Sequence, residues 1–279
     1  MDSTLALLVL FAALLHASWN ALLKVPGDAL TRLAVINLTG AGVAAVLLPW
    51  VAPPAAASWP FIAASVVTHL FYYLCLIRAY REGDLSLVYP LARGAAPLLV
   101  ALGAWVLAGE SLSPAGVLAV LVISAGILAL AASGWRRASA STLGFAFATG
   151  LTIVAYTLID GLGARRAGSV EGYIVWLFAI DGLPLTVAAY YLRRHTLAQT
   201  LRTSWAPGLI GGLCSVVAYG LVVWAMTRAP MTYVSALRET SVVLAALIGT
   251  RVFREPLGAL RVSAAVVVAV GVAALQLAR

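Results

Sequence analysis

The chain carries one pattern of residues twice. Residues 85–130 (LSLVYPLARGAAPLLVALGAWVLAGESLSPAGVLAVLVISAGILAL) align with residues 231–275 (MTYVSALRETSVVLAALIGTRVFREPLGALRVSAAVVVAVGVAAL) with one single-residue gap. The alignment, continued upstream, pairs identical residues of the two copies: Arg93 with Arg238, Glu110 with Glu255, Gly126 with Gly271, Tyr73 with Tyr219 and Ala79 with Ala225. Each copy has five apolar segments, and an odd number sends the second copy through a bilayer in the opposite direction. The duplication therefore predicts two inverted five-helix repeats, at 1–135 and 142–279.

Composition identifies lipid as the solvent. Hydrophobic residues make up 63% of the chain and charged residues 10%, whereas a soluble domain carries about 25% charged residues. The formal charge of +8 does not indicate nucleic acid, because the basic residues form short clusters between the apolar segments. We expect the bilayer, and no nucleic acid, as the macromolecular surroundings of the chain.

Ten apolar segments have the length, about 20 residues, that a helix needs to cross the hydrocarbon layer. Alternation of period two is absent from them, so helices are the expected spans and the fold class is an all-α membrane protein. The expected spans are 3–23, 31–50, 60–80, 85–108, 114–133, 142–162, 171–191, 207–227, 231–250 and 256–277. The longest connection, 192–206, mixes basic residues with Leu and Trp, which predicts a short amphipathic helix along the membrane surface.

The distribution of Lys and Arg predicts the orientation of the chain. Even-numbered connections hold three basic residues: Arg165, Arg166 and Arg228. Odd-numbered connections hold eleven: Lys24, Arg32, Arg78, Arg81, Arg136, Arg137, Arg193, Arg194, Arg202, Arg251 and Arg254. Because cytoplasmic loops are enriched in positive charge, the odd connections are expected in the cytoplasm. This predicts a multi-pass protein of the bacterial inner membrane with both termini in the periplasm.

Several stretches resemble a known family. Both halves end in a glutamate turn and a small-residue helix (VLAGESLSPAGVLAVLVISAGILAL and VFREPLGALRVSAAVVVAVGVAAL), and LLHASWNALLK and AYREGDLSLVYPL precede the first of these. Together they resemble the EamA-type repeat of the drug/metabolite transporter superfamily. The resemblance implies a ten-helix bundle with a central substrate cavity, and an exporter of small metabolites, amino acids or drugs. The chain is also similar to the bacterial exporters of aromatic amino acids in this superfamily. The second copy departs from the first in having Val242 where the first has Pro97.

Ionisable residues deep in the spans are the first candidates for substrate binding. Arg93, Arg238 and Glu239 lie about eight residues into the fourth and ninth spans, where an unpaired charge costs at least about 2.5 kcal/mol. Two arginines that approach from opposite sides are suited to hold an anionic group, since a guanidinium pairs well with a carboxylate. The alternative is a structural ion pair with Glu239. The sequence leaves both open.

A polar pair recurs one helical turn apart in the first helix of each repeat. His16 and Asn20 share one face of the first span, and Tyr156 and Asp160 share one face of the sixth. The recurrence predicts facing walls of one polar cavity, with His16 and Asp160 as titratable candidates for proton handling. Interhelical hydrogen bonding without a substrate role is the alternative.

Aromatic residues gather in the third and eighth spans. His69 and Tyr73, one turn apart, form a candidate wall with Tyr219 and Trp224, which suits an aromatic or cationic substrate. Packing within the bundle is the alternative. Asp181 lies near the middle of the seventh span, where we prefer a packing role beside Gly182 and Pro184 to proton coupling.

Helix breaks and metal sites can also be judged from the sequence. Pro90 and Pro97 predict a flexible or broken fourth helix near Arg93. Cys75 and Cys214 lie inside apolar segments without metal-ligand spacing, so we expect no metal and no cofactor.

The leading hypothesis is a monomeric secondary transporter that binds a small molecule between the repeats and works by alternating access, with protons as a candidate coupling ion. No Walker motif is present, so ATP is not the expected direct energy source. A nucleotide-sugar or cationic-drug carrier of the same fold is an alternative. An intramembrane enzyme is disfavoured because the chain has three histidines, of which His195 lies in a connection, and no acidic pair of the DxxxD type. A channel is disfavoured because no selectivity-filter sequence recurs.

Cysteine labelling tests the orientation. With Cys75 and Cys214 replaced by alanine, the variants Asp2→Cys and Ala278→Cys should react with a membrane-impermeant maleimide added to intact cells. Arg194→Cys, in a connection expected in the cytoplasm, is the control and should react only after permeabilisation. Protection of both termini in intact cells would overturn the orientation.

Overall fold

The computed structural model describes the chain except residues 1, 24, 83–84, 136–137, 253–258 and 279. Lys24, Arg136, Arg137, Arg254 and Glu255 thus lie outside the described residues. The described part contains helices and connections but no strand. The α-helices are α1 (Ser3–Leu22), α2 (Ala29–Leu47), α3 (Trp59–Glu82), α4 (Leu85–Gly94), α5 (Ala96–Ala108), α6 (Pro114–Trp135), α7 (Ala140–Arg165), α8 (Val170–Arg193), α9 (Leu197–Met226), α10 (Met231–Arg238), α11 (Thr240–Val252) and α12 (Ala259–Leu277). Short 3₁₀ turns, η1 (Leu48–Trp50) and η2 (Ala56–Ser58), lie between α2 and α3.

The helices confirm the predicted class, an all-α multi-pass membrane protein. Within the described residues, 8 stretches are long and apolar enough to cross a membrane. One of them, Leu87–Ala108, includes both parts of the predicted fourth span. The predicted ninth span corresponds to α10 and α11 together, and the tenth to α12.

Helix ends follow ordinary capping chemistry. Asp28 and Ser139 accept hydrogen bonds from the backbone N–H groups of Thr31 and Thr142, three residues into α2 and α7. A side-chain oxygen at this position satisfies an amide that has no partner within the helix. At the C-terminal end of α5, Gly109 has a φ of 67°, a conformation that glycine adopts without strain. The helices α2 and α7 thus begin at residues whose side chains can cap them, and α5 ends at a glycine.

Two of the spans are broken inside the bundle. In the fourth span, α4 ends at Gly94 and α5 begins at Ala96 with Pro97 in its first turn. Proline lacks the N–H that would continue the hydrogen-bond ladder, which explains the predicted interruption near Arg93. In the ninth span α10 ends at Arg238 and α11 begins at Thr240, although no proline is present there.

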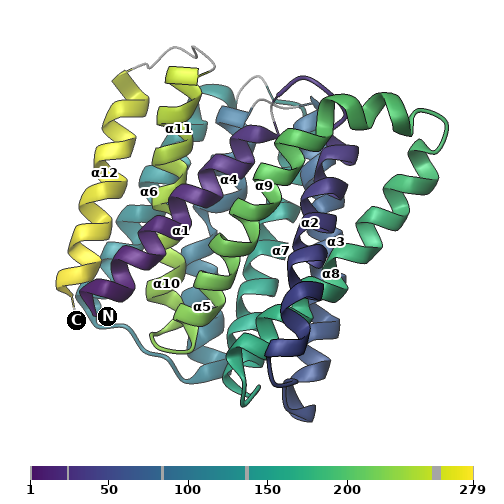
Figure 1. Ribbon diagram of the computed structural model, residues 1–279. Helices are drawn as coiled ribbons and strands as arrows, with labels where there is room; N and C mark the ends of the chain where they lie inside the picture. Colours follow the sequence, from purple (N-terminus) through teal and green to yellow (C-terminus); the bar gives the residue numbers. More distant parts are fainter. Residues whose placement is uncertain (1, 24, 83–84, 136–137, 253–258, 279) are drawn as a thin grey trace.

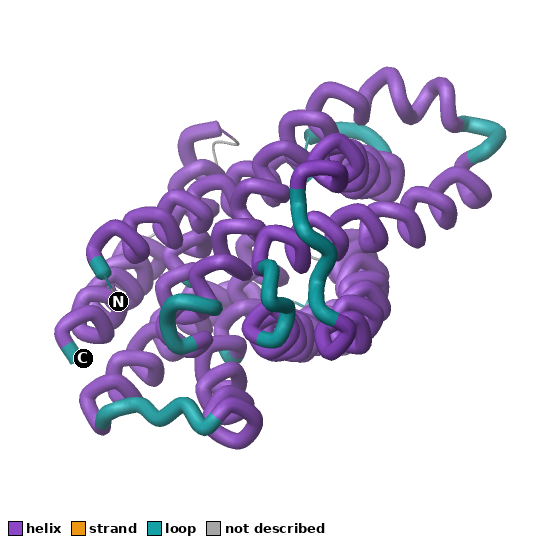
Figure 2. The backbone as a smooth tube through the Cα atoms, turned by 60° about the horizontal axis from the view of Figure 1, so that its bottom comes forward, coloured by secondary structure: helices purple, strands orange, loops and turns teal. Residues whose placement is uncertain are grey.

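The two halves of the chain are interleaved. The most extensive helix contacts join α3 to α7, α2 to α8, α6 to α12, α2 to α9 and α1 to α9, each pair having one member from either half. Figure 1 shows α6 beside α12, and both termini at one end of the bundle. Figure 2, seen from that end, again places the termini next to each other. A cavity in the centre of such a bundle has walls from both halves.

The contact of α6 with α12 depends on two glycines that the sequence alignment paired. A Cβ on Gly126 would lie 3.2 Å from the backbone nitrogen of Val268, and a Cβ on Gly271 would lie 3.1 Å from that of Ile123. Ile123 and Val268 each stand three residues before the glycine of their own helix. The contact is therefore reciprocal, as a local two-fold relation between the helices requires.

The predicted surface helix at 192–206 takes a different form. Residues 197–206 are helical, but they continue into α9 without a break. Figure 1 shows the beginning of α9 running across the end of the bundle before the helix turns into it. Pro207 lies within α9 and removes one internal hydrogen bond. A bent α9 thus replaces the separate amphipathic helix.

Substitution of Gly126 tests the close packing of α6 on α12. Gly126→Leu should lower the melting temperature of the purified protein in detergent, because overpacking a tight contact costs about 1–3 kcal/mol. Gly144→Leu in α7 is the matched control, since a Cβ there meets no atom within 4 Å. Equal melting temperatures for the two variants would contradict the proposed contact.

Candidate substrate site

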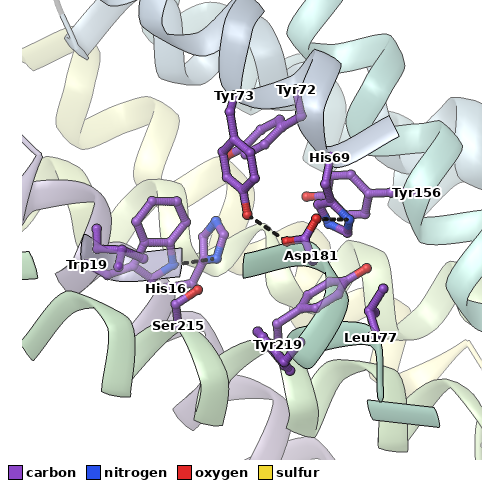
Figure 3. Close-up of a pocket in the computed structure, with 12 residues that line it drawn as sticks. His16, Trp19, His69, Tyr72, Tyr73, Tyr156, Leu177, Asp181, Ser215 and Tyr219 are labelled. Carbon is purple, nitrogen blue, oxygen red and sulfur yellow. Dashed lines mark hydrogen bonds and ion pairs between the residues drawn. The ribbon is translucent and has the colours of Figure 1, made fainter. Parts of the chain in front are cut away.

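A polar and aromatic cavity lies in the centre of the bundle (Figure 3). Its walls come from α1, α2, α3, α7, α8 and α9, and its lining residues are His16, Trp19, Ile36, His69, Tyr72, Tyr73, Tyr156, Leu177, Phe178, Asp181, Ser215 and Tyr219. The free volume is about 40 Å³, room for about three water molecules. Pockets for small organic ligands usually offer at least about 300 Å³, so the walls must separate before such a ligand can enter.

Stacked rings form one wall of the cavity. The His69 imidazole stacks on Tyr156 with ring centroids 4.4 Å apart, and Tyr219 meets both rings edge-on. These residues come from α3, α7 and α9. Aromatic faces attract both flat apolar groups and cations, so this wall suits a ligand that has either.

Asp181 places a carboxylate directly at the cavity. It projects from the middle of α8, where Tyr73 Oη donates a hydrogen bond to Oδ2 at 3.2 Å (Figure 3). His69 Nδ1 lies 3.9 Å from Oδ1. The sequence favours a packing role for Asp181, but the side chain lines the cavity together with aromatic rings and an imidazole.

Asp160, in contrast, lies behind the aromatic wall. It is fully buried in α7, and its two oxygens accept hydrogen bonds from the hydroxyl groups of Tyr173, at 2.8 Å, and of Tyr219. The carboxylate is not among the groups that line the cavity. Two tyrosine hydroxyls therefore satisfy it, and it fixes the position of Tyr219.

The two helix breaks are joined by an ion pair. Arg93 Nε donates to Glu239 Oε2 at 2.8 Å, and Nη2 donates to Oε1 at 2.7 Å. Both side chains are buried, with 2% and 1% of their surface exposed. Arg93 precedes the break between α4 and α5 by two residues, and Glu239 is the residue between α10 and α11. A bidentate pair of this kind is strong and directional, and here it links the two halves of the chain.

His16 lies between this ion pair and the cavity. Its Nε2 is 3.2 Å from Arg93 Nη1, and its Nδ1 accepts a hydrogen bond from Trp19 Nε1 at 3.2 Å. Guanidinium and indole N–H groups only donate, so both ring nitrogens face donors. This arrangement favours a neutral imidazole, because a second ring proton would face another donor.

Arg238 is buried like Arg93, and most of its donors are unpaired among the described residues. Nη2 donates to Tyr156 Oη at 3.1 Å, whereas Nε and Nη1 have no hydrogen-bond partner in the described part of the chain. The guanidinium carbon lies about 6 Å from the ring centroids of Tyr156 and Tyr219. Arg238 does not line the cavity but lies against two rings of its wall. A buried guanidinium with free donors is expected to bind an anion.

An ion pair connects the two halves near the end where the termini lie. Glu110, in the connection after α5, accepts hydrogen bonds from Arg165 Nη2 at 2.7 Å and from the backbone nitrogen of Met231 at 3.0 Å. Arg165 Nε also donates to the carbonyl oxygen of Met226, at the end of α9. The pair therefore fastens the connection after α5 to the ends of α7 and α9 and the beginning of α10.

A second ion pair lies at the opposite end. Arg193 Nη2, at the end of α8, donates to Asp28 Oδ1 at 3.0 Å, while Asp28 Oδ2 caps α2 through Thr31. Burial raises the pKa of the Asp28 carboxyl, but the hydrogen bonds from Arg193 and Thr31 outweigh this effect and hold the pKa below its ordinary value. Asp28 is therefore ionised at neutral pH, and the pair joins the first half to the second.

The comparisons with known proteins agree with this architecture. Residues 140–276 match the EamA-like transporter family. This half of the chain belongs to the EamA-like transporter family. The protein is therefore a membrane transporter of small substrates. No curated protein matches the sequence significantly.

One solved structure extends the likeness of this EamA-like chain to its full length. That crystal structure, described only as a protein, has a TM-score of 0.76 and covers 100% of this chain and 99% of its own. The sequence identity is 21%, so the similarity concerns the fold alone.

The structure brings some of the predicted site residues to the cavity of the EamA-like chain and leaves others behind its walls. Those that line the cavity are His16, His69, Tyr73, Tyr156 and Tyr219. Those that do not are Asn20, Arg93, Asp160, Trp224, Arg238 and Glu239. Lining residues that the sequence analysis did not select are Trp19, Ile36, Tyr72, Leu177, Phe178, Asp181 and Ser215. Helical spacing could have identified two of these residues. Trp19 stands three residues after His16, and Tyr72 three residues after His69, so each lies on the same helical face as a predicted residue.

Double substitution tests the ion pair between the helix breaks. Arg93→Met or Glu239→Leu alone should lower the melting temperature strongly, because each leaves a buried charge uncompensated, at a cost of about 3–5 kcal/mol. The double variant should be more stable than either single variant, since it removes both charges. Tryptophan fluorescence of detergent-solubilised protein gives the three melting temperatures. Additive losses in the double variant would show that the charges do not compensate each other.

Proposed function

We propose that this protein is a secondary transporter that exports amino acids, aromatic ones among them, by alternating access. The substrate binds in the central cavity, whose walls come from both halves of the chain. The reciprocal contact of Gly126 and Gly271 and the pairing of α6 with α12 support two repeats related by a two-fold axis. In such a carrier, rocking of one half against the other exposes the cavity to each side in turn.

Arg238 is the observation on which this proposal depends. It is 2% exposed, its Nε and Nη1 are unpaired among the described residues, and it lies beside two rings of the cavity wall. When Tyr156 and Tyr219 move apart as the cavity expands, the free donors can take the carboxylate of an amino acid. Arg93 is less suited to this role, because Glu239 already occupies two of its nitrogens.

The ion pairs at the two ends of the bundle can each hold one end closed, as alternating access requires. Glu110 with Arg165 holds one end, and Asp28 with Arg193 holds the other. Each pair joins the two halves, so opening of either end requires its pair to separate. With the orientation expected from the basic connections, the first pair faces the periplasm and the second faces the cytoplasm.

Transport by an Arg238 variant tests the proposed function. L-phenylalanine is the probe, because it combines a carboxylate with a ring that suits the aromatic wall. Wild-type protein in liposomes should take up radiolabelled L-phenylalanine with saturation, and should show counterflow as a carrier does. Arg238→Gln should raise the KM at least about tenfold, which corresponds to about 1.4 kcal/mol of lost binding. Arg238→Lys should give an intermediate KM, since lysine keeps the charge but lacks the planar donor set.

Arg228→Gln is the matched control for this experiment. Arg228 is an exposed arginine in the connection between α9 and α10. Its loss should leave the KM unchanged. The anchoring role fails if Arg238→Gln inserts normally and binds L-phenylalanine as tightly as the control does.

A further inference from the structure

Among the residues that the structure describes, no arginine or lysine forms an ion pair or hydrogen bond with the carboxylate of Asp181. The groups at its oxygens are the neutral hydroxyl of Tyr73 and, at 3.9 Å, the imidazole of His69. A carboxylate at membrane depth is costly unless it is protonated, paired or hydrated. A proton on Asp181, or a cationic group of a ligand beside it, removes this cost.

The nearby charged residues are already engaged or separated from Asp181. Glu239 compensates Arg93, and Arg238 points its one bonded nitrogen at Tyr156. Asp160 is held by Tyr173 and Tyr219. None of these four side chains lines the cavity, whereas Asp181 does.

Each helix packed on α8 presents a defined set of groups to this site. From α3 come Tyr73 and His69, from α7 come Asp160 and Tyr156, and from α9 comes Tyr219. The contribution of α2 to the cavity is Ile36, which carries no titratable group. The surroundings of Asp181 are thus hydroxyl groups, one imidazole and one further carboxylate.

We propose that Asp181 binds the ammonium group of the substrate in exchange for a proton. This inference rests on the proposed function and identifies the group of the same cavity that takes the cationic end of the substrate. In the empty cavity Asp181 is the neutral acid. When the substrate R–NH₃⁺ enters, the O–H bond of Asp181 breaks, the proton leaves to the solvent, and an Asp181 carboxylate–ammonium pair forms. The Asp181 site is neutral before and after the exchange, so the Asp181 carboxylate is never left unpaired in the membrane.

The aromatic residues around Asp181 complete a site for an organic cation. Tyr73, Tyr219 and Phe178 line the cavity with it, and aromatic rings attract ammonium groups. Arg238 lies against Tyr156 and Tyr219 of the aromatic wall without lining the cavity itself. An amino acid in the expanded cavity thus has its ammonium group at Asp181 and its carboxylate towards Arg238.

Proton release on binding tests the exchange. Three probes share a phenyl ring: L-phenylalanine has both charged groups, phenethylamine has the ammonium alone, and 3-phenylpropionate has the carboxylate alone. Each is added to purified protein in weakly buffered detergent solution with a pH indicator, and binding is measured by calorimetry. Wild-type protein should release about one proton for each bound L-phenylalanine or phenethylamine, and none for 3-phenylpropionate. Phenethylamine affinity should fall about tenfold for each unit of decrease in pH, because the proton competes for the same carboxylate.

Variants of Asp181 decide whether this residue is the exchange site. Asp181→Asn should abolish the proton release and weaken phenethylamine binding at least about tenfold. Asp181→Glu, which restores a carboxylate, should recover the release and guards against a merely structural effect. Glu171→Gln is the matched control, since it removes an exposed carboxylate from the first turn of the same helix and should change nothing.

The outcomes separate this inference from the proposed function. If L-phenylalanine binds but releases no proton, or if Asp181→Asn releases as many protons as the wild type, the exchange is overturned while the transport function stands. Loss of release in His69→Gln with Asp181 intact would place the proton on the imidazole and overturn the assignment to Asp181. If the wild type binds none of the three probes, the proposed substrate class fails, and the exchange with it.

Discussion

The ion pair of Arg93 with Glu239 is the interaction on which the centre of this transporter depends. Broken helices in a membrane leave backbone groups without their usual partners, and they are tolerated only inside a protein or beside a cavity. Here one break from each half lies next to a charge that its partner helix compensates. The pair holds the two weak points of the bundle together, so the fourth and ninth spans are not free to move independently of each other.

This pairing also determines the chemistry of the site. Because Glu239 is used by Arg93, the neighbouring Arg238 keeps two free donors, and His16 meets donors on both ring nitrogens. The side of the bundle near α1 and α10 therefore offers hydrogen-bond donors. Across the aromatic rings, α8 offers the Asp181 carboxylate. On our proposal, this difference orients a zwitterion, with its carboxylate on the donor side and its ammonium group at Asp181.

The sequence predicts the fold well because the bilayer imposes simple rules on it. Span length and helical structure follow from the need to pair backbone groups in lipid. The break near Pro97 follows from the N–H group that proline lacks. The site is harder to predict, because the hydrogen-bond partner that each polar side chain finds depends on the tertiary packing of the helices. Helical spacing places Asp160 on the face of Tyr156, but a hydroxyl from α8 and one from α9 take its oxygens. Asp181 has one such partner, the hydroxyl of Tyr73, and it lines the cavity.

The packing between the helices determines where the proposed rocking motion can and cannot occur. At the crossing of α6 and α12 the backbones approach so closely that even a methyl group on Gly126 or Gly271 would collide with the partner helix. A packed contact of this kind is not easily sheared. The ion pairs at the two ends, in contrast, are partly exposed, so water can replace their hydrogen bonds when they separate. Movement is therefore expected around a fixed α6–α12 contact, with the two ends opening by loss of their ion pairs and the central pair of Arg93 and Glu239 remaining intact.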